Sequence, residues 1–217
     1  MPSPKIEITT SNAILKKACI KKALLITKGI SSFFPKSPKL IIVHIFDNRE
    51  QFLKSIKKKN APSWLVASVP PQSTSLIFLL NEHGELSKNT AQILIHEIAH
   101  LYTNANNPDL PTCIKEGISV FLAKQIFAKS IKKQDWEKIV TNGIPFKKIQ
   151  WQSAAKHNGY SAAGLLVSFL IKKCGKKNFL NAIWSYDQKV SLFKTFASIS
   201  KHSPDSLLKD FSKSFVK

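Results

Sequence analysis

The chain has few cysteines, and their number and placement limit both its chemistry and its compartment. Cys19, Cys113 and Cys174 are odd in number and widely separated among 217 residues. They have no metal-binding spacing and form no disulfide framework, so the sequence predicts three free thiols in a reducing compartment. Cys113 is expected to be a packed thiol rather than a metal ligand.

Long uninterrupted apolar runs are also missing. The apolar pieces Ala23–Thr27 and Leu40–Phe46 are too short, or too interrupted by lysine, to form a signal peptide or a membrane span. We therefore expect a cytoplasmic protein without a transmembrane segment, with leaderless export left open. Hydrophobic residues still make up 43% of the chain, which is enough for a core. The length then predicts one domain over residues 1–217, with a small helical appendage to one domain as the alternative.

Acidic residues are scarce. Lysine and arginine total 33 against 13 acidic residues, which gives a formal net charge of +20, and Arg49 is the only arginine. Lysine without arginine indicates a diffuse positive field rather than bidentate phosphate clamps. Such a field favours anionic surfaces or acidic substrates and makes association sensitive to salt. A plain solvated lysine coat explains the same composition, and no specific nucleic-acid motif accompanies it.

Against this background one pentapeptide carries chemistry: His96-Glu97-Ile98-Ala99-His100. On a helix, residues four apart differ in direction by about 40° and lie one turn apart, so both imidazoles can bind one ion. Ser87 predicts the start of that helix, and its uncharged flanks predict burial. Two histidines and an adjacent carboxylate form the H-E-x-x-H pattern of zinc hydrolases. Two core histidines that share a face by chance are the alternative.

A catalytic zinc ion needs a third protein ligand, and Glu116 is the candidate. After a polar break at 104–108, Pro111 fits the first turn of a second helix that continues through 113–123. Glu116 is the only carboxylate in that segment. A short connection between antiparallel helices would bring it back toward the histidines. A solvated surface glutamate is the alternative.

These two segments resemble the gluzincin metallopeptidases, particularly the peptidase MA-like group. The resemblance rests on His-Glu-Ile-Ala-His at 96–100 and on Leu-Pro-Thr-Cys-Ile-Lys-Glu-Gly-Ile-Ser at 110–119. It implies a zincin-type active-site helix, with one zinc ion per chain held by His96, His100 and Glu116. It also implies that Glu97 activates a zinc-bound water for peptide-bond hydrolysis.

Two positions depart from the family pattern. Cys113 stands where tryptophan is usual, so packing near the third ligand must differ. Val120 stands where some gluzincins have an aspartate four residues after the ligand glutamate. The residue that would orient His96 is therefore unassigned.

The oxyanion of peptide hydrolysis needs a donor besides the metal, and Tyr160 and His157 are the candidates. Tyr160 matches the family position better; a buried structural tyrosine and an ordinary loop histidine are the alternatives. The resemblance implies a peptide or protein substrate, and the charge suggests an acidic one. Two other functions stay open. One is an inactive zinc-bearing scaffold that binds an anionic partner through its lysine-rich surface, and the other is hydrolysis of a non-peptide amide.

Hydrophobic patterns predict an α+β fold, with a small mixed sheet and helices over about 1–103 and a mostly helical part over about 104–217. Predicted strands cover 5–9, 40–46, 64–69 and 75–80. Besides the two metal-site helices, predicted helices cover 12–28, 48–58, 131–140, 160–174, 178–187, 192–200 and 204–215. In the first of them Ile14, Leu15, Ala18, Cys19 and Leu25 lie on or near one face. By resemblance, Ser75–Leu80 is the edge strand that pairs with extended substrate backbone.

Overall fold

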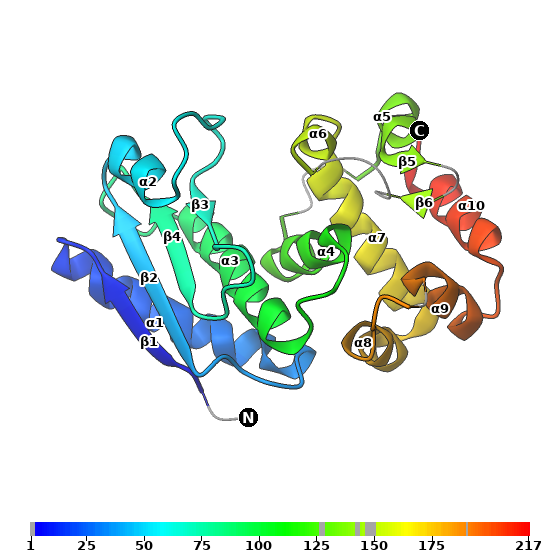
Figure 1. Ribbon diagram of the computed structural model, residues 1–217, viewed down its shortest axis with the longest axis horizontal. Coiled ribbons are helices and arrows are strands. Elements are labelled where there is room, and N and C mark those ends of the chain that lie inside the picture. Colours follow the sequence, from blue (N-terminus) through cyan, green and yellow to red (C-terminus); the bar gives the residue numbers. More distant parts are fainter. Residues whose placement is uncertain (1–2, 126–128, 142–143, 146–150, 190) are drawn as a thin grey trace. The chain divides into compact units, whose positions relative to one another are not determined.

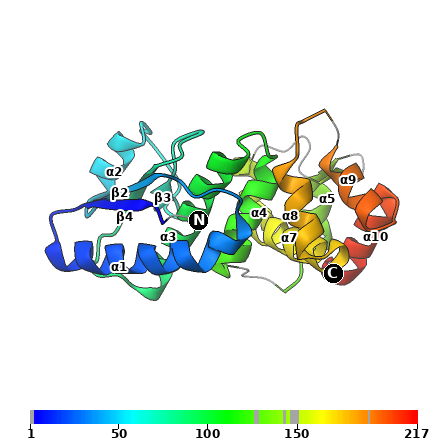
Figure 2. The same cartoon turned by 90° about the horizontal axis from the view of Figure 1, so that it is seen from below.

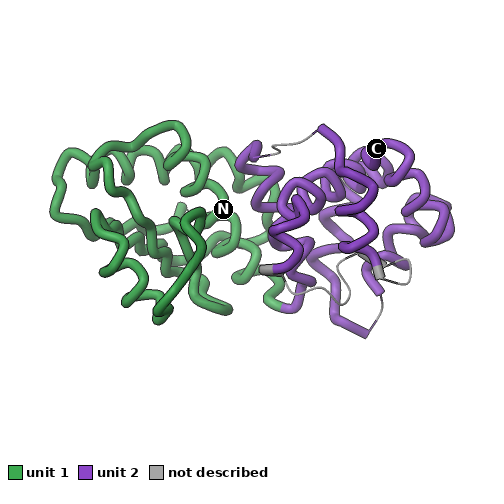
Figure 3. The backbone as a smooth tube through the Cα atoms, turned by 90° about the horizontal axis from the view of Figure 1, so that it is seen from above, with its two compact units in different colours: residues 1–108 green, residues 109–217 purple. Residues whose placement is uncertain are grey.

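The computed structural model describes residues 3–125, 129–141, 144–145, 151–189 and 191–217. The chain forms two compact units, residues 1–108 and residues 109–217 (Figures 1 and 3). The first unit combines a small mixed sheet with helices, and the second is mostly helical. This arrangement confirms the predicted α+β class. That both parts make one domain stays a prediction.

The sheet of the first unit contains β1 (Lys5–Thr9), β2 (Leu40–Phe46), β3 (Ala67–Ser68) and β4 (Leu76–Leu80), in the order β1-β2-β4-β3. β2 pairs in parallel with β1 and β4, and β3 runs antiparallel to β4. β4 is thus an interior strand, and the prediction that Ser75–Leu80 forms the edge is wrong. The edges are β1 and β3. The edge strand that packs against α3 is β3, which is short because the following Pro70 and Pro71 cannot donate ladder hydrogen bonds.

The two faces of this sheet are covered differently. α1 (Ala13–Ile30), continued by a 3₁₀ turn at Ser31–Phe33, and α3 (Lys88–Asn106) pack on one face (Figure 2). α2 (Arg49–Ser55) covers part of the other, where Phe52 meets Phe46 edge-on. Side chains alternate along each strand, so one set is buried under α1 and α3 while the other is mostly half-buried. The fully buried set is Ile41, Val43, Ile77 and Leu79.

Asn12 caps the start of α1, because its side chain accepts a hydrogen bond of 2.9 Å from the Leu15 amide. Its buried face includes Leu15, Cys19, Ala23 and Ile26. Ile14 and Leu25, which the sequence pattern assigned to the face of Leu15 and Cys19, are 84% and 61% exposed. That part of the prediction is wrong. Neighbouring residues on a helix point about 100° apart, so Ile14 and Leu25 turn away when Leu15 and Ile26 face the sheet.

The second unit is built around α7 (Gly159–Cys174), in which Ala162, Ala163, Leu166 and Val167 are fully buried. The other helices are α4 (Thr112–Ala123), α5 (Lys133–Ile139), α6 (Trp151–Lys156), α8 (Lys176–Trp184), α9 (Leu192–Ile199) and α10 (Pro204–Phe215). All of them except α5 contact α7 extensively. Two short strands, β5 (Val140–Thr141) and β6 (Ile144–Pro145), pair antiparallel. The predicted helices of this part are confirmed with shifts of up to three residues at their ends, whereas α6 and the β5–β6 pair were not predicted.

None of the helices in the described part of the chain combines the length and the apolar character needed to span a bilayer.

Candidate metal centre

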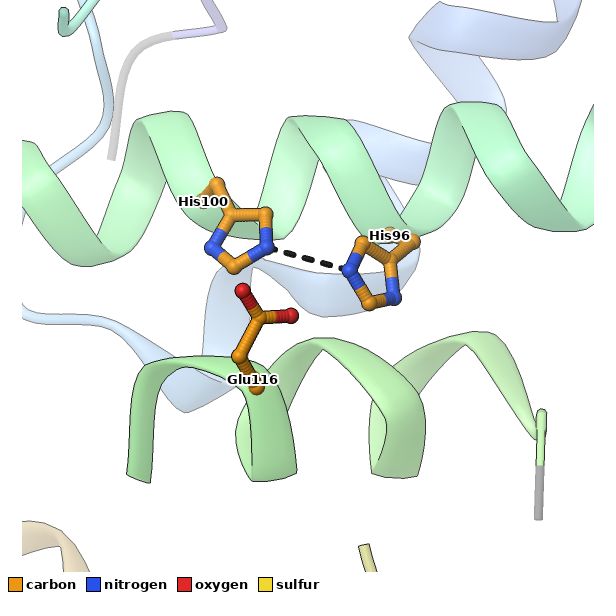
Figure 4. Close-up of side chains that lie close together, drawn as sticks. All are labelled: His96, His100 and Glu116. Atoms are coloured by element: carbon orange, nitrogen blue, oxygen red, sulfur yellow. Dashed lines mark hydrogen bonds between the residues drawn. The ribbon is translucent and has the colours of Figure 1, made fainter. Parts of the chain in front are cut away.

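The two histidines of the pentapeptide share one face of α3, as predicted. Ser87 caps this helix, because its hydroxyl oxygen accepts a hydrogen bond of 3.1 Å from the Thr90 amide. The Nε2 atoms of His96 and His100 are 3.0 Å apart (Figure 4). Two nitrogen atoms bound tetrahedrally to one zinc ion lie ~3.3 Å apart, since each Zn–N bond is ~2.0–2.1 Å long. The histidine pair therefore already has nearly the spacing that one ion requires.

Polar side chains on this helix are buried at a cost in free energy. His96 is 7% exposed and Glu97 is 9% exposed, while their neighbours Leu94, Ile98 and Ala99 are fully buried. Transferring an imidazole or a carboxylate out of water costs free energy that hydrogen bonds or charge pairing must offset. Burial alone would favour apolar residues at both positions.

Glu116 completes a group of three potential ligands. It is half-buried in α4, which begins directly after Pro111, one residue later than the sequence indicated. The ligand atoms of His96, His100 and Glu116 all lie within 4.8 Å of one another, and the Glu116 carboxylate points toward the histidines (Figure 4). Within the described part of the chain, no other trio of His, Cys, Asp or Glu comes together in this way. These three residues could hold a metal ion.

The residue after Glu116 determines how closely α4 can approach α7. A Cβ atom on Gly117 would lie 2.5 Å from the Ala163 carbonyl oxygen and 2.7 Å from a Val167 methyl group. Neither distance is tolerable, so only glycine lets the two helices meet this closely. The close packing fixes the part of α4 that carries Glu116. Sequence reasoning missed this role, although a glycine in the middle of a helix is itself a signal of close packing.

Two further side chains of α4 have shifted proton affinities. Burial raises the pKa of the Cys113 thiol to about 12. Cys113 is therefore a protonated, packed thiol at neutral pH, and it is outside the group of three potential ligands. All three cysteines are free, as expected, and all three are buried. Burial also lowers the pKa of Lys115, an effect that the negative charges of Asp109 and Glu116 oppose. Lys115 therefore gives up its proton more readily than an exposed lysine does, and it stands next to Glu116, the candidate metal ligand, in the sequence.

The two oxyanion candidates have different surroundings. His157 Nδ1 lies 3.2 Å from Asp135 Oδ1, and the Asn158 amide donates to the other oxygen of the same carboxylate at 3.0 Å. This pairing gives His157 a structural role in joining α5 to the start of α7. Tyr160 is half-buried in the first turn of α7. Its catalytic role stays a prediction.

Comparison with known proteins adds no family assignment: no family model matches the chain, and no curated protein matches it. The resemblance to gluzincins therefore rests on the residues of the two motifs and stays a prediction.

Proposed function

We propose that the protein is a zinc-dependent metallopeptidase of the gluzincin type. The observation that carries this proposal is the grouping of His96, His100 and Glu116 within 4.8 Å, with the buried Glu97 beside the first ligand. Two imidazoles and one carboxylate are the ligand set of a catalytic zinc ion that keeps a position open for water. Calcium and magnesium prefer all-oxygen sets, so the two imidazoles favour zinc or a related transition metal.

Each residue of the proposed site has its own role in peptide hydrolysis. A zinc ion held here would lower the pKa of water to about 7 and polarise the scissile carbonyl. Glu97 takes the proton of the attacking water and passes it to the leaving amine, a transfer that needs a carboxylate in a water-poor site. The Tyr160 hydroxyl donates a hydrogen bond to the oxyanion that develops on the carbonyl oxygen. His96 and His100, whose Nε2 atoms are 3.0 Å apart, would hold the ion together with Glu116.

The sheet edge suggests how an extended peptide is held. Of the two edge strands, β3 is the one that packs, with β4, against α3. An extended backbone can add to such an edge through main-chain hydrogen bonds, which accept any sequence. The role that the resemblance assigns to the sheet edge therefore passes from β4 to β3. The positive charge of the chain favours acidic peptides as substrates.

Metal content tests the ligand assignment. Protein purified without chelators should contain one zinc ion per chain by elemental mass spectrometry. His100→Ala should lose that zinc, since one remaining imidazole and a carboxylate hold it weakly. His83→Ala is the matched control, because His83 is exposed in the segment before α3, and it should keep the zinc. Undiminished zinc in His100→Ala would remove His100 from the ligand set.

A digest of a peptide library, read by mass spectrometry, tests the activity. Cleavage should disappear when a chelator removes the metal and return when zinc is added. Tyr160→Phe should lower turnover by ~10²–10³ with little change in KM, because the hydroxyl acts on charge that forms only in the transition state. Unchanged turnover would mean that Tyr160 has a structural role and no catalytic one. Zinc-loaded protein that cleaves no peptide would favour the inactive scaffold or the non-peptide amide hydrolase.

A further inference from the structure

The outer face of α1 exposes apolar side chains that the fold does not cover. Ile14 is 84% exposed, Leu25 61% and Leu24 46%. They are three of the four large hydrophobic residues that are exposed in the described part of the chain, and all three lie on this one helix. In Figure 2 α1 lies outside the sheet, on one side of it. Isolated exposed apolar residues are common, but a group on one helix indicates a binding surface.

The same face is strongly basic. Lys17, Lys21 and Lys28 are exposed, and they lie seven residues before, three residues before and four residues after Leu24, which places them on the same side of the helix. Together with Ile20 and Leu25 they line a shallow groove of about 690 Å³. From Ile8 to Phe46 the chain holds no acidic residue, while lysine stands at positions 16, 17, 21, 22, 28, 36 and 39. Nothing in this stretch neutralises the positive charge.

We infer that this outer face of α1 binds the surface of an anionic lipid bilayer, with the helix lying parallel to the membrane. Along the face the order is Ile14, Lys17, Lys21, Leu24, Leu25, Lys28. In this orientation the apolar tips enter the boundary between headgroups and acyl chains, and the lysine ammonium groups meet lipid phosphates and carboxylates. The long lysine stems reach the headgroups while their methylene groups lie along the apolar surface.

The arrangement of the side chains favours a bilayer over other anionic partners. Ile14 and Leu25 protrude and alternate with lysines, whereas a protein partner would require an apolar floor with a basic rim. Nucleic-acid phosphates would attract the lysines but would leave Ile14 and Leu25 without a contact. A second copy of the chain would bring like-charged faces together. A fluid surface needs no complementary shape, so it accepts both kinds of side chain.

Vesicle co-sedimentation of the full chain tests the inference. The protein should bind vesicles of equal parts phosphatidylcholine and phosphatidylserine, should not bind phosphatidylcholine alone, and should dissociate as salt is raised. The triple variant Lys17→Gln, Lys21→Gln, Lys28→Gln should bind about 100-fold more weakly, because each lysine at an acidic bilayer contributes about fivefold.

A second triple variant provides the matched control. Lys54→Gln, Lys58→Gln and Lys59→Gln remove the same charge from exposed positions in and after α2, which covers the other face of the sheet. This variant should bind within about fivefold of the wild type. Equal weakening by the two triples would show a diffuse lysine coat and overturn the inference, as would absence of binding to phosphatidylserine vesicles.

The contribution of the apolar side chains to vesicle binding is measured separately. Ile14→Ser with Leu25→Ser should keep its circular dichroism spectrum and melting temperature yet bind vesicles at least about tenfold more weakly. A polarity-sensitive fluorophore on Leu25→Cys should shift to the blue with acidic vesicles; the three native thiols are buried, so only the new thiol reacts. Unchanged binding, or an unshifted spectrum, would overturn the inference. So would tighter binding to a DNA duplex than to vesicles, with loss in the α1 lysine variant.

Discussion

α1 and α3 pack on the same face of one sheet and depart from ordinary amphipathic helices in opposite directions. α3 buries His96 and Glu97 in an apolar setting, whereas α1 leaves Ile14, Leu24 and Leu25 in water. A surface helix normally turns its apolar stripe to the core and its polar face to solvent. Both departures cost free energy, so both mark positions that folding stability alone does not explain. On α3 the cost accompanies three residues that could hold a metal ion, and on α1 it accompanies a basic outer face.

Glu97→Gln should give the largest effect of these substitutions. It tests whether the buried carboxylate of α3 has a chemical role as well as a packing role. We expect hydrolysis to fall by ~10²–10⁴ because the amide cannot accept the proton of the attacking water. Zinc content and melting temperature should be kept, since glutamine has the same shape and is neutral. Glu50→Gln, at an exposed carboxylate of α2, should change nothing. Full peptidase activity in Glu97→Gln would remove Glu97 as the base.

Truncating one leucine on each helix tests the contrast in stability. Leu94→Ala in α3 should cost about 2–5 kcal/mol, because Leu94 is fully buried and its loss leaves a cavity. Leu25→Ala in α1 should change the free energy of unfolding by less than about 0.5 kcal/mol, because this side chain is already largely exposed. Urea unfolding of both variants measures the difference. Similar losses for the two would mean that something covers the outer face of α1.

Two glycines test the same contrast at the level of the backbone. Gly117→Ala should destabilise by about 1–3 kcal/mol and weaken zinc binding, because its Cβ would strike the Ala163 carbonyl of α7. Gly29→Ala, in the last turn of α1, meets nothing within 4 Å and should stabilise by about 0.5–1 kcal/mol. Thermal unfolding and zinc titration give both values. A neutral Gly117→Ala would contradict the close packing of α4 on α7.

A smaller effect should be visible at alkaline pH, on the buried face of α1. Burial raises the pKa of Cys19 to about 11, against about 8.5 in an unfolded chain. The folded state therefore keeps the thiol proton longer, so this contribution is fully present below about pH 8.5 and is lost as the pH rises toward 11. Urea unfolding of wild type and Cys19→Ala between pH 7 and 11 should show a steeper alkaline loss in the wild type. Parallel curves would refute the assignment.

Local patterns predicted the elements well, and packing decided the rest. The bounds of β1, β2 and α10 follow from alternation, helical periodicity and capping, which depend on neighbouring residues only. α6 is short and has a weak pattern, so it was missed. The edge position was assigned to β4 instead of β3 because strand order depends on pairing between distant segments. The buried face of α1 was partly misassigned because apolar residues surround this helix and the sheet selects among them.

For the candidate site too, local patterns predict some features and only tertiary packing decides the others. By itself the sequence determines that His96 and His100 share a face and that Glu97 lies beside them, because 3.6 residues per turn is a property of the helical backbone. It also names Glu116 as the only carboxylate of its segment. Only the tertiary structure decides that Glu116 lies within 4.8 Å of both histidines, that Gly117 is needed against α7, and that Ile14 and Leu25 face water. Each of these facts depends on contacts between residues far apart in the chain, which no local pattern encodes.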